Sequence, residues 1–133
     1  MLGKRLLIIE DDPVMSESLS FSLTKRGYKI ETAVTGTTGI FLCQKFSPDL
    51  LILDLILPDT HGLEVLDEIR ANDWGRDLKV LVLTNVENDS LKQKLYTMGV
   101  VDYLLKINTT LTKLADTVDS ILSTDQTVSW TLS

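Results

Sequence analysis

The strongest constraint on this chain is a set of short, continuous apolar runs, each of which stops at a polar residue. The clearest runs, of four residues each, are Leu6–Ile9, Leu50–Leu53 and Val80–Leu83. A strand that is apolar at every position is buried on both faces, which is typical of a parallel sheet. Weaker strand candidates lie at Ile30–Val34 and Val100–Leu105.

Segments with helical periodicity separate these runs. Pro13 suits the first position of a helix that Asp12 is expected to cap, and Gly27 suits its end, where a residue with positive φ is favoured. Apolar residues in this segment recur every four positions, at Met15, Leu19 and Leu23. Further helices are expected at Thr37–Lys45, around Leu63, Leu66 and Ile69, and from Asn88 to Met98, where Gly99 marks the end. A last helix is expected at Thr109–Leu122, with Leu111, Leu114, Val118 and Ile121 on one stripe.

Five strands that alternate with five helices predict an α/β fold, a doubly wound five-stranded parallel sheet with helices on both faces. The length of 133 residues fits one domain, with no internal repeat and no linker rich in Pro, Gly or Ser. The expected domain covers residues 1–123. Residues 124–133 show no periodicity and are expected to form a C-terminal tail.

Charge and composition exclude several classes of protein. The net charge of −6, from 13 Lys+Arg against 19 Asp+Glu, disfavours direct binding to nucleic acid or to an anionic membrane. Lys4-Arg5 precede an apolar run that is too short for a signal peptide, and no stretch approaches the roughly 20 apolar residues of a membrane span. The single cysteine, Cys43, lies among apolar residues and is interpreted as a small buried hydrophobe. A cytoplasmic location is the default expectation.

Polar side chains follow the apolar runs at the places where the strands are expected to end. In chain order they are Glu10, Asp11 and Asp12, then Asp54, Thr84 and Lys106. Ligands of open α/β sheets bind outside the carboxyl ends of the strands, so we expect these side chains to lie close together. Any one of them has an ordinary structural explanation, such as helix capping or a strand terminus. Their shared position is what indicates a site.

The chemistry of this set suits phosphoryl transfer. Clustered carboxylates favour a hard cation such as Mg²⁺, which usually takes one or two protein carboxylates and keeps several waters. One carboxylate can attack phosphorus and form an acyl phosphate. A lysine and a threonine hydroxyl can each contact a phosphoryl oxygen.

The ordered motifs resemble the receiver domain of bacterial response regulators over about residues 4–123. The segments that carry the resemblance are residues 7–12 (LIIEDD), 48–62 (PDLLILDLILPDTHG), 82–84 (VLT) and 102–106 (DYLLK). Pro58 falls four positions after Asp54, Thr84 thirty after Asp54, and Lys106 twenty-two after Thr84, as this family has them. Several motifs in the right order at the right spacing form a specific signal.

The resemblance implies a flavodoxin-like fold with strand order 2-1-3-4-5, and a role for each motif residue. Asp54 would be the phosphoacceptor and a Mg²⁺ ligand, and Asp11 a second ligand. Glu10 would act on the ion through water, and the main-chain carbonyl of Ile56 would complete the protein ligands. Lys106 would contact the phosphoryl group.

Thr84 and Tyr103 would form a switch pair that re-shapes the surface of the fourth helix, fifth strand and fifth helix. The other interpretation of Tyr103 is a half-buried strand aromatic. Expected partners are a sensor histidine kinase or a phosphotransfer protein, and a downstream protein or output domain. A homodimer is compatible with the sequence, but nothing in it specifies one. Such a domain is a signalling domain, an enzyme only in promoting its own phosphorylation and dephosphorylation.

The chain departs from the family at two positions. Ile107 follows the lysine where proline is usual, often with a cis bond, so a trans and more mobile loop is expected around Lys106. Asn85 follows the threonine where a small residue is usual, and we expect it to narrow access to the phosphoryl group or to bond to it.

Other residues near the motifs carry narrower expectations. The apolar Ile56 and Val86 are expected to hinder the attacking water and to prolong the life of the phosphoryl-aspartate. His61 is expected to be a solvated turn residue and not a phospho-relay histidine.

Other functions on related folds fit less well. A receiver-like module that binds partners without phosphorylation keeps the fold but not the chemistry. An aspartyl-phosphate hydrolase of the haloacid-dehalogenase kind needs a second aspartate two residues after the first, where this chain has Ile56. A flavin carrier needs a phosphate loop after the first strand, where Glu10 and Asp11 would repel phosphate.

Overall fold

The computed structural model describes the backbone of residues 3–131 and the side chains of residues 3–123. The strands are β1 (Arg5–Ile9), β2 (Lys29–Ala33), β3 (Leu50–Leu53), β4 (Lys79–Thr84) and β5 (Val100–Leu105). The α-helices are α1 (Pro13–Thr24), α2 (Gly36–Phe46), α3 (Gly62–Ala71), α4 (Asp89–Thr97) and α5 (Leu111–Thr131). Short 3-10 helices at Asp73–Gly75 and Lys106–Asn108 were not expected from the sequence.

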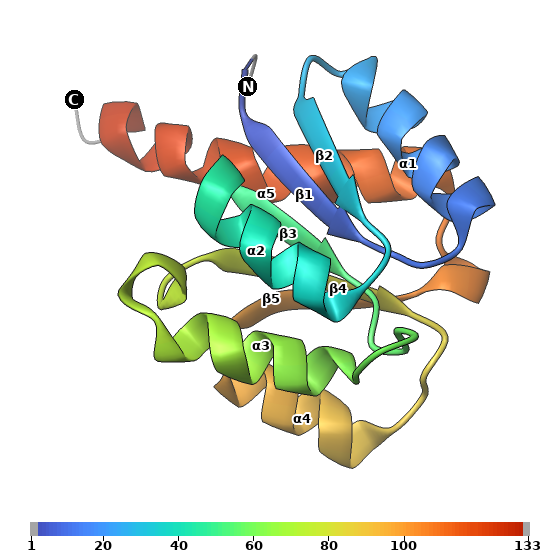
Figure 1. Ribbon diagram of the computed structural model, residues 1–133. Coiled ribbons are helices and arrows are strands. Elements are labelled where there is room, and N and C mark those ends of the chain that lie inside the picture. The colour runs from blue at the N-terminus through green and yellow to red at the C-terminus, as the bar shows by residue number, and fades with distance from the viewer. Residues whose placement is uncertain (1–2, 132–133) are drawn as a thin grey trace.

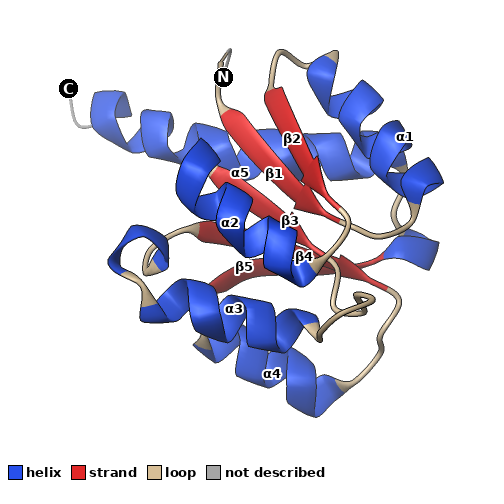
Figure 2. Ribbon diagram, in the orientation of Figure 1, coloured by secondary structure: helices blue, strands red, loops and turns tan. Residues whose placement is uncertain are grey.

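The five strands form one parallel sheet in the order β2-β1-β3-β4-β5, which confirms the predicted fold class. Helices α1 and α5 cover one face, and α2, α3 and α4 cover the other (Figures 1 and 2). Alternate residues of the central strands supply the two cores. Leu7 and Ile9 pack with α2, α3 and α4, whereas Leu6 and Ile8 pack with α1 and α5.

Side-chain caps set the starts of several helices. Asp12 caps α1 by accepting from the Val14 N–H at 3.0 Å, as predicted. Asn88 caps α4 by accepting from Leu91. After the C-terminal ends of α1 and α4, Gly27 and Gly99 have φ values of 95° and 87°, which residues with a Cβ rarely adopt. The turns that the sequence placed at these glycines are therefore confirmed.

Helix α5 differs from its prediction. It runs to Thr131 instead of ending near residue 122, so its backbone includes most of the expected tail. No proline or glycine occurs in residues 111–133 to stop it. The buried stripe also lies differently, because Leu114, Val118 and Leu122 are buried but Leu111 is 42% exposed.

Two further expectations from the sequence concern Cys43 and membrane-spanning helices. Cys43 is buried in α2, which confirms its interpretation as a small buried hydrophobe, and burial raises the pKa of its thiol to about 12. Among the described residues, no helix has both the length and the apolar content needed to cross a membrane.

Candidate functional site

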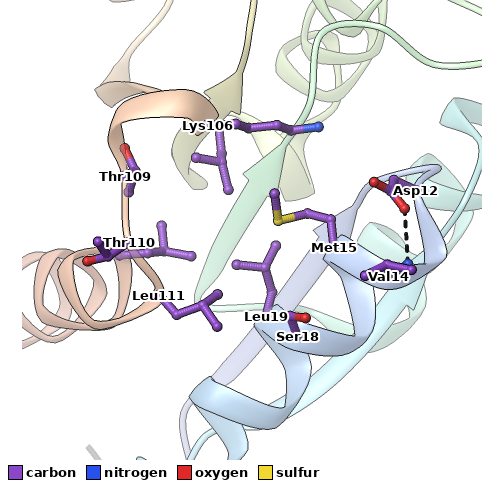
Figure 3. A pocket seen from close by; sticks show the side chains of 11 residues that line it. Asp12, Val14, Met15, Ser18, Leu19, Lys106, Thr109, Thr110 and Leu111 are labelled. Atoms are coloured by element: carbon purple, nitrogen blue, oxygen red, sulfur yellow. Dashed lines mark hydrogen bonds between the residues drawn. The ribbon is translucent and has the colours of Figure 1, made fainter.

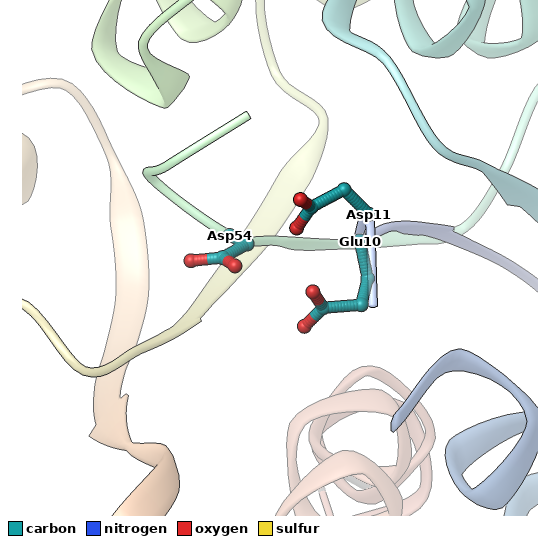
Figure 4. A group of neighbouring side chains, drawn as sticks. All are labelled: Glu10, Asp11 and Asp54. Atoms are coloured by element: carbon teal, nitrogen blue, oxygen red, sulfur yellow. The ribbon is translucent and has the colours of Figure 1, made fainter. Parts of the chain in front are cut away.

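Three carboxylates meet where β1 and β3 end at the carboxyl edge of the sheet. Glu10 and Asp11 directly follow β1, and Asp54 directly follows β3. One oxygen of each lies within 4.8 Å of the others, and Figure 4 shows Glu10 and Asp11 extending toward the side of Asp54. Glu10 is 2% exposed and Asp54 is 6% exposed, whereas Asp11 is exposed to solvent. The strand register brings these groups together because β1 and β3 are direct neighbours.

Lys106 bridges the two buried carboxylates. It follows β5, and its Nζ lies 2.6 Å from Glu10 Oε1 and 2.8 Å from Asp54 Oδ2. The Lys106 side chain is only 14% exposed. An ammonium thus lies beside Asp54 at the distance of a charge-assisted hydrogen bond.

The electrostatics of the site follow from this burial. Burial raises the pKa of Glu10, against the hydrogen bond from Lys106, which lowers it. Burial lowers the pKa of Lys106, but its hydrogen bonds to Asp54 and Glu10 outweigh that effect and raise it overall. Lys106 therefore stays charged at neutral pH and offsets one of several negative charges.

Thr84 and Tyr103 are connected through the main chain of Val86. Thr84 is fully buried, and its Oγ1 accepts from the Val86 N–H at 3.4 Å. The Tyr103 hydroxyl donates to the Val86 carbonyl oxygen at 2.6 Å. Tyr103 is 7% exposed, so its ring is more buried than the half-buried position considered from the sequence.

The loop after β3 returns close to Asp54 because Gly62 lacks a side chain. A Cβ at residue 62 would lie only 2.6 Å from the Asp54 carbonyl oxygen. The N–H of Gly62 donates to the Leu55 carbonyl oxygen at 2.7 Å. His61 was expected to be a solvated turn residue; its Nδ1 in fact accepts from the Leu63 N–H at 3.0 Å and caps α3. Sequence reasoning missed this cap, although a polar residue before a helix is its usual signal.

The same loop is fixed to α2 by Asp59. Its carboxylate accepts from the N–H groups of Gly36 and Thr37 at 2.8 and 3.0 Å, and from the Thr37 hydroxyl at 2.8 Å. These groups lie at the N-terminus of α2, where backbone N–H groups lack helical partners. The contact joins residues 23 positions apart, so no local pattern revealed it.

Asn85 and Ile107, the two departures from the family pattern, contact each other. The Ile107 N–H donates to Asn85 Oδ1 at 3.0 Å. The described residues contain no cis peptide bond, so the Lys106–Ile107 bond is trans, as expected. The mobility of this loop stays a prediction.

A mainly apolar pocket of about 270 Å³ lies beside the acidic site (Figure 3). Met15 and Leu19 of α1 form one side, and residues 109–111 at the start of α5 form another. Lys106 lines the pocket and also contacts the acidic site. The exposed Leu111 thus faces this pocket and not the core.

Of the six side chains that follow the apolar runs, the structure brings four into one cluster: Glu10, Asp11, Asp54 and Lys106. Thr84 lies at the end of β4 and accepts from the Val86 N–H, and the Asp12 carboxylate caps α1. The Ile56 side chain is 57% exposed, and its N–H donates to Asp54 Oδ1 at 3.4 Å. Ile56 is therefore next to the Asp54 carboxylate, and the metal-binding role of its main-chain carbonyl stays a prediction.

Comparison with known proteins identifies the family. The model of the response regulator receiver domain matches residues 6–119. The chain belongs to the response regulator receiver domain family. Receiver domains are signalling modules, and the acidic cluster of this one fits a phosphoacceptor aspartate beside a metal site.

Individual relatives agree with this assignment. The receiver domain is 38% identical, over 102 residues, to the "DNA-binding dual master transcriptional regulator RpaA" of Synechocystis, a match that covers 77% of this chain and 42% of that protein. The chain thus spans less than half the length of the curated relatives it matches.

Solved structures show the same fold. The signal receiver domain of a putative Luxo repressor protein from Vibrio parahaemolyticus is 28% identical, with a TM-score of 0.86 and 98% of both chains covered. A putative response regulator from Chloroflexus aurantiacus is 30% identical, with a TM-score of 0.81, over 91% of this chain and 98% of that one.

Proposed function

We propose that this receiver domain accepts a phosphoryl group on Asp54 from a sensor histidine kinase or a phosphotransfer protein. The observation that carries the proposal is the convergence of Asp54, Glu10 and Asp11 with Lys106 at one edge of the sheet. Asp54 and Glu10 both contact the lysine, and Asp54 is the one that directly follows β3, the central strand of the sheet. Lys106 lies 2.8 Å from Asp54, so its ammonium can also offset the negative charge of a phosphoryl group on Asp54.

The acidic cluster fits Mg²⁺. The three carboxylates offer hard oxygen ligands within reach of one ion, and two of them are buried with only one cation between them. Asp11 and Asp54 would bind the ion directly, Glu10 through water, and the Ile56 carbonyl would add a main-chain ligand. When bound, the ion supplies positive charge that shields Asp54 and the incoming phosphoryl oxygens from each other.

The chain's own residues divide the remaining work. One Asp54 oxygen attacks phosphorus, and the bond from phosphorus to the donor breaks as the acyl phosphate forms. Lys106 then donates to a phosphoryl oxygen in place of its present contact with Asp54, and the Thr84 hydroxyl donates to another. Thr84 is the last residue of β4 and is fully buried, so its hydroxyl lies at this edge of the sheet.

Thr84 and Tyr103 form the switch pair of this proposal. Movement of the Thr84 hydroxyl toward a phosphoryl group would act on the Val86 N–H, and the Val86 carbonyl holds Tyr103. Tyr103 also lines the surface formed by α4 and β5, with Glu87, Lys92 and Leu105. Phosphorylation would thereby change the surface of α4, β5 and α5 that partners bind.

A downstream protein or an output domain would read this surface in the cytoplasm. RpaA is named as a DNA-binding regulator, and an output of that class is compatible with the receiver domain. The receiver domain's own net charge of −6 does not favour direct contact with nucleic acid. A second copy of this receiver domain, forming a homodimer, is a further partner compatible with this proposal. Any catalysis is limited to its own phosphorylation and dephosphorylation.

The alternative is a receiver domain that binds partners without phosphorylation. The deciding experiment treats the protein with Mg²⁺ and acetyl phosphate or beryllofluoride, and follows intact mass and NMR shifts, with Asp54→Asn as control. We expect a Mg²⁺-dependent change in the wild type that the variant lacks, with shifts at Thr84 and Tyr103. No change in the wild type would favour the alternative.

A further inference from the structure

Two residues that depart from the family pattern form one contact beside Lys106. Asn85 stands where a small residue is usual, and Ile107 stands where proline is usual. The Asn85 Oδ1 accepts from the Ile107 N–H at 3.0 Å, although the two residues are 22 positions apart. A small apolar residue at 85 would offer no acceptor, and a proline at 107 would offer no donor. The contact therefore exists only when both departures occur together.

The sheet register explains why these residues meet. Thr84 is paired with Leu105 in the last step of the β4–β5 ladder. Asn85 and Lys106 each follow the paired residues, and Ile107 is one position further. The Asn85 side-chain carbonyl thus takes the place of a main-chain carbonyl and extends the pairing beyond the end of β4.

The contact lies on the main chain that carries Lys106. On one side of Lys106, Leu105 is held in the ladder and its carbonyl accepts from the Thr109 hydroxyl at 2.8 Å. On the other side, the Ile107 N–H is held by Asn85. The Lys106 backbone is consequently fixed both before and after the residue, while its Nζ reaches Glu10 and Asp54.

We propose that Asn85 is a positioning residue: its side chain binds the Ile107 N–H and holds the loop so that Lys106 points at Asp54. Among the described residues, the Asn85 side chain hydrogen-bonds to neither Glu10 nor Asp54, so its action would pass through the loop. This inference rests on the proposed function of Asp54. It differs from the two expectations drawn from the sequence, that Asn85 narrows access to the phosphoryl group or bonds to it.

Substitutions at Asn85 separate the hydrogen bond from steric effects. Asn85→Ala removes both the acceptor and the bulk, whereas Asn85→Leu removes the acceptor and keeps the bulk. We expect both variants to bind beryllofluoride in the presence of Mg²⁺ about 3- to 10-fold more weakly, since one solvent-exposed hydrogen bond is lost. Mg²⁺ binding without beryllofluoride should stay unchanged, because the proposed ligands are Asp11, Asp54 and the Ile56 carbonyl, and not Lys106.

Substitutions at Ile107 test the other half of the contact. Ile107→Pro removes the N–H and should weaken beryllofluoride binding in the presence of Asn85, whereas Ile107→Ala keeps the N–H and is the matched control. The double variant Asn85→Ala with Ile107→Pro should bind no more weakly than either single variant, because both changes break the same bond. Amide hydrogen exchange at Ile107 should accelerate in Asn85→Ala and Asn85→Leu alike.

The outcomes distinguish this inference from the proposed function. If the wild type does not respond to beryllofluoride, the proposed function fails, and with it the role of Asn85. If the wild type responds but Asn85→Ala and Asn85→Leu match it, the positioning role is wrong. The positioning role is also wrong if only Asn85→Ala differs, which would indicate access, or if the two single effects multiply in the double variant.

Discussion

Glu10 and Asp54 are carboxylates buried in a place where water cannot fully solvate them. Each would cost free energy if left unpaired there, and Lys106 offsets only part of that cost. Asp11, the third carboxylate, adds negative charge at the exposed side. A divalent cation bound here would neutralise this excess negative charge. It would thereby offset the free-energy cost of burying the two carboxylates.

The apolar side chains at Ile56 and Val86 yield a prediction about phosphoryl lifetime. The double variant Ile56→Asn with Val86→Gln should lose the phosphoryl group roughly fivefold faster, equivalent to about 1 kcal/mol in the barrier, because polar groups admit and orient the attacking water. The measurement is the decay of the phosphorylated mass after the donor is removed. Ile56→Leu with Val86→Ile is the matched control and should decay at about the wild-type rate. An equal or slower decay in the polar variant would contradict the prediction.

At the residue scale, sequence reasoning located most site residues but not their contacts. Glu10, Asp54 and Lys106 directly follow strands and Thr84 ends one, and parallel strands bring such positions to one edge whatever the details of packing. The bond between Asn85 and Ile107 depends on the register of β4 and β5, which shifts between Val80 and Leu81. Such a shift has no signature in composition or periodicity.

At the scale of elements, local signals succeeded where they were strong. Strands β1, β3 and β4 were predicted from continuous apolar runs, and Gly27 and Gly99 marked the ends of α1 and α4. The edge strand β2 was harder to predict because it is largely exposed, and its buried and exposed residues do not alternate regularly. Helix α5 was predicted too short because the apolar stripe fades before the helix does.

Asp59 makes the stability of α2 depend on pH. The N–H groups of Gly36 and Thr37 hold the pKa of Asp59 to about 2, against an ordinary value of 3.8. A depressed pKa in the folded protein means that folding favours the ionised carboxylate, so its contribution is complete above about pH 4 and lost as the pH falls toward 2. We expect Asp59→Ala to lower the free energy of unfolding at pH 7, and the difference from wild type to shrink below pH 4.

The measurement for Asp59 is urea unfolding of both proteins across this pH range. Asp59→Asn keeps an acceptor oxygen without the charge, so it should fall between the two at pH 7. A difference that stays constant from pH 7 to pH 2 would show that the charge of Asp59 plays no part.

Tyr28 and Arg26 connect the segment between α1 and β2 to α5. The Tyr28 hydroxyl donates to Asp119 Oδ1 at 2.5 Å, and Arg26 donates to the other oxygen at the same distance. Tyr28 is 3% exposed, so water cannot replace the lost partner well. Tyr28→Phe should therefore lower the free energy of unfolding by about 1–2 kcal/mol in urea titrations.

A second variant controls for the general loss of charge around α5. Asp116 contacts Arg26 with a side chain that is 65% exposed. Asp116→Ala should have a much smaller effect than Tyr28→Phe, because exposed ion pairs contribute little. Equal effects of the two variants would argue against a specific contribution of the tyrosine.

At the scale of the whole molecule, one sheet separates two cores, and we expect the two cores to unfold together. Leu6 and Leu7 are neighbours on β1, both fully buried, and they belong to opposite faces. Leu6→Ala and Leu7→Ala should each lower the free energy of unfolding by about 2–5 kcal/mol, in a single transition. Val101→Ala, at a 43% exposed position of the edge strand β5, should cost much less. Two separate transitions in either leucine variant would contradict a cooperative fold.

The overall topology was predictable because few arrangements satisfy the pattern. Strands that alternate with helices require parallel pairing and right-handed crossovers, and the resemblance to receiver domains then supplied the order 2-1-3-4-5. Contacts between distant segments, such as Asp59 with Gly36, were not predictable, because many polar residues could form them equally well.

The link between Thr84 and Tyr103 passes through the peptide groups of Val86 and not through its side chain. Every amino acid except proline carries the same donor and the same acceptor. Substitution at residue 86 can therefore change the chemistry around the site without cutting the link. A search for positions that tolerate no change would therefore overlook this connection, because only proline at residue 86 would remove its donor.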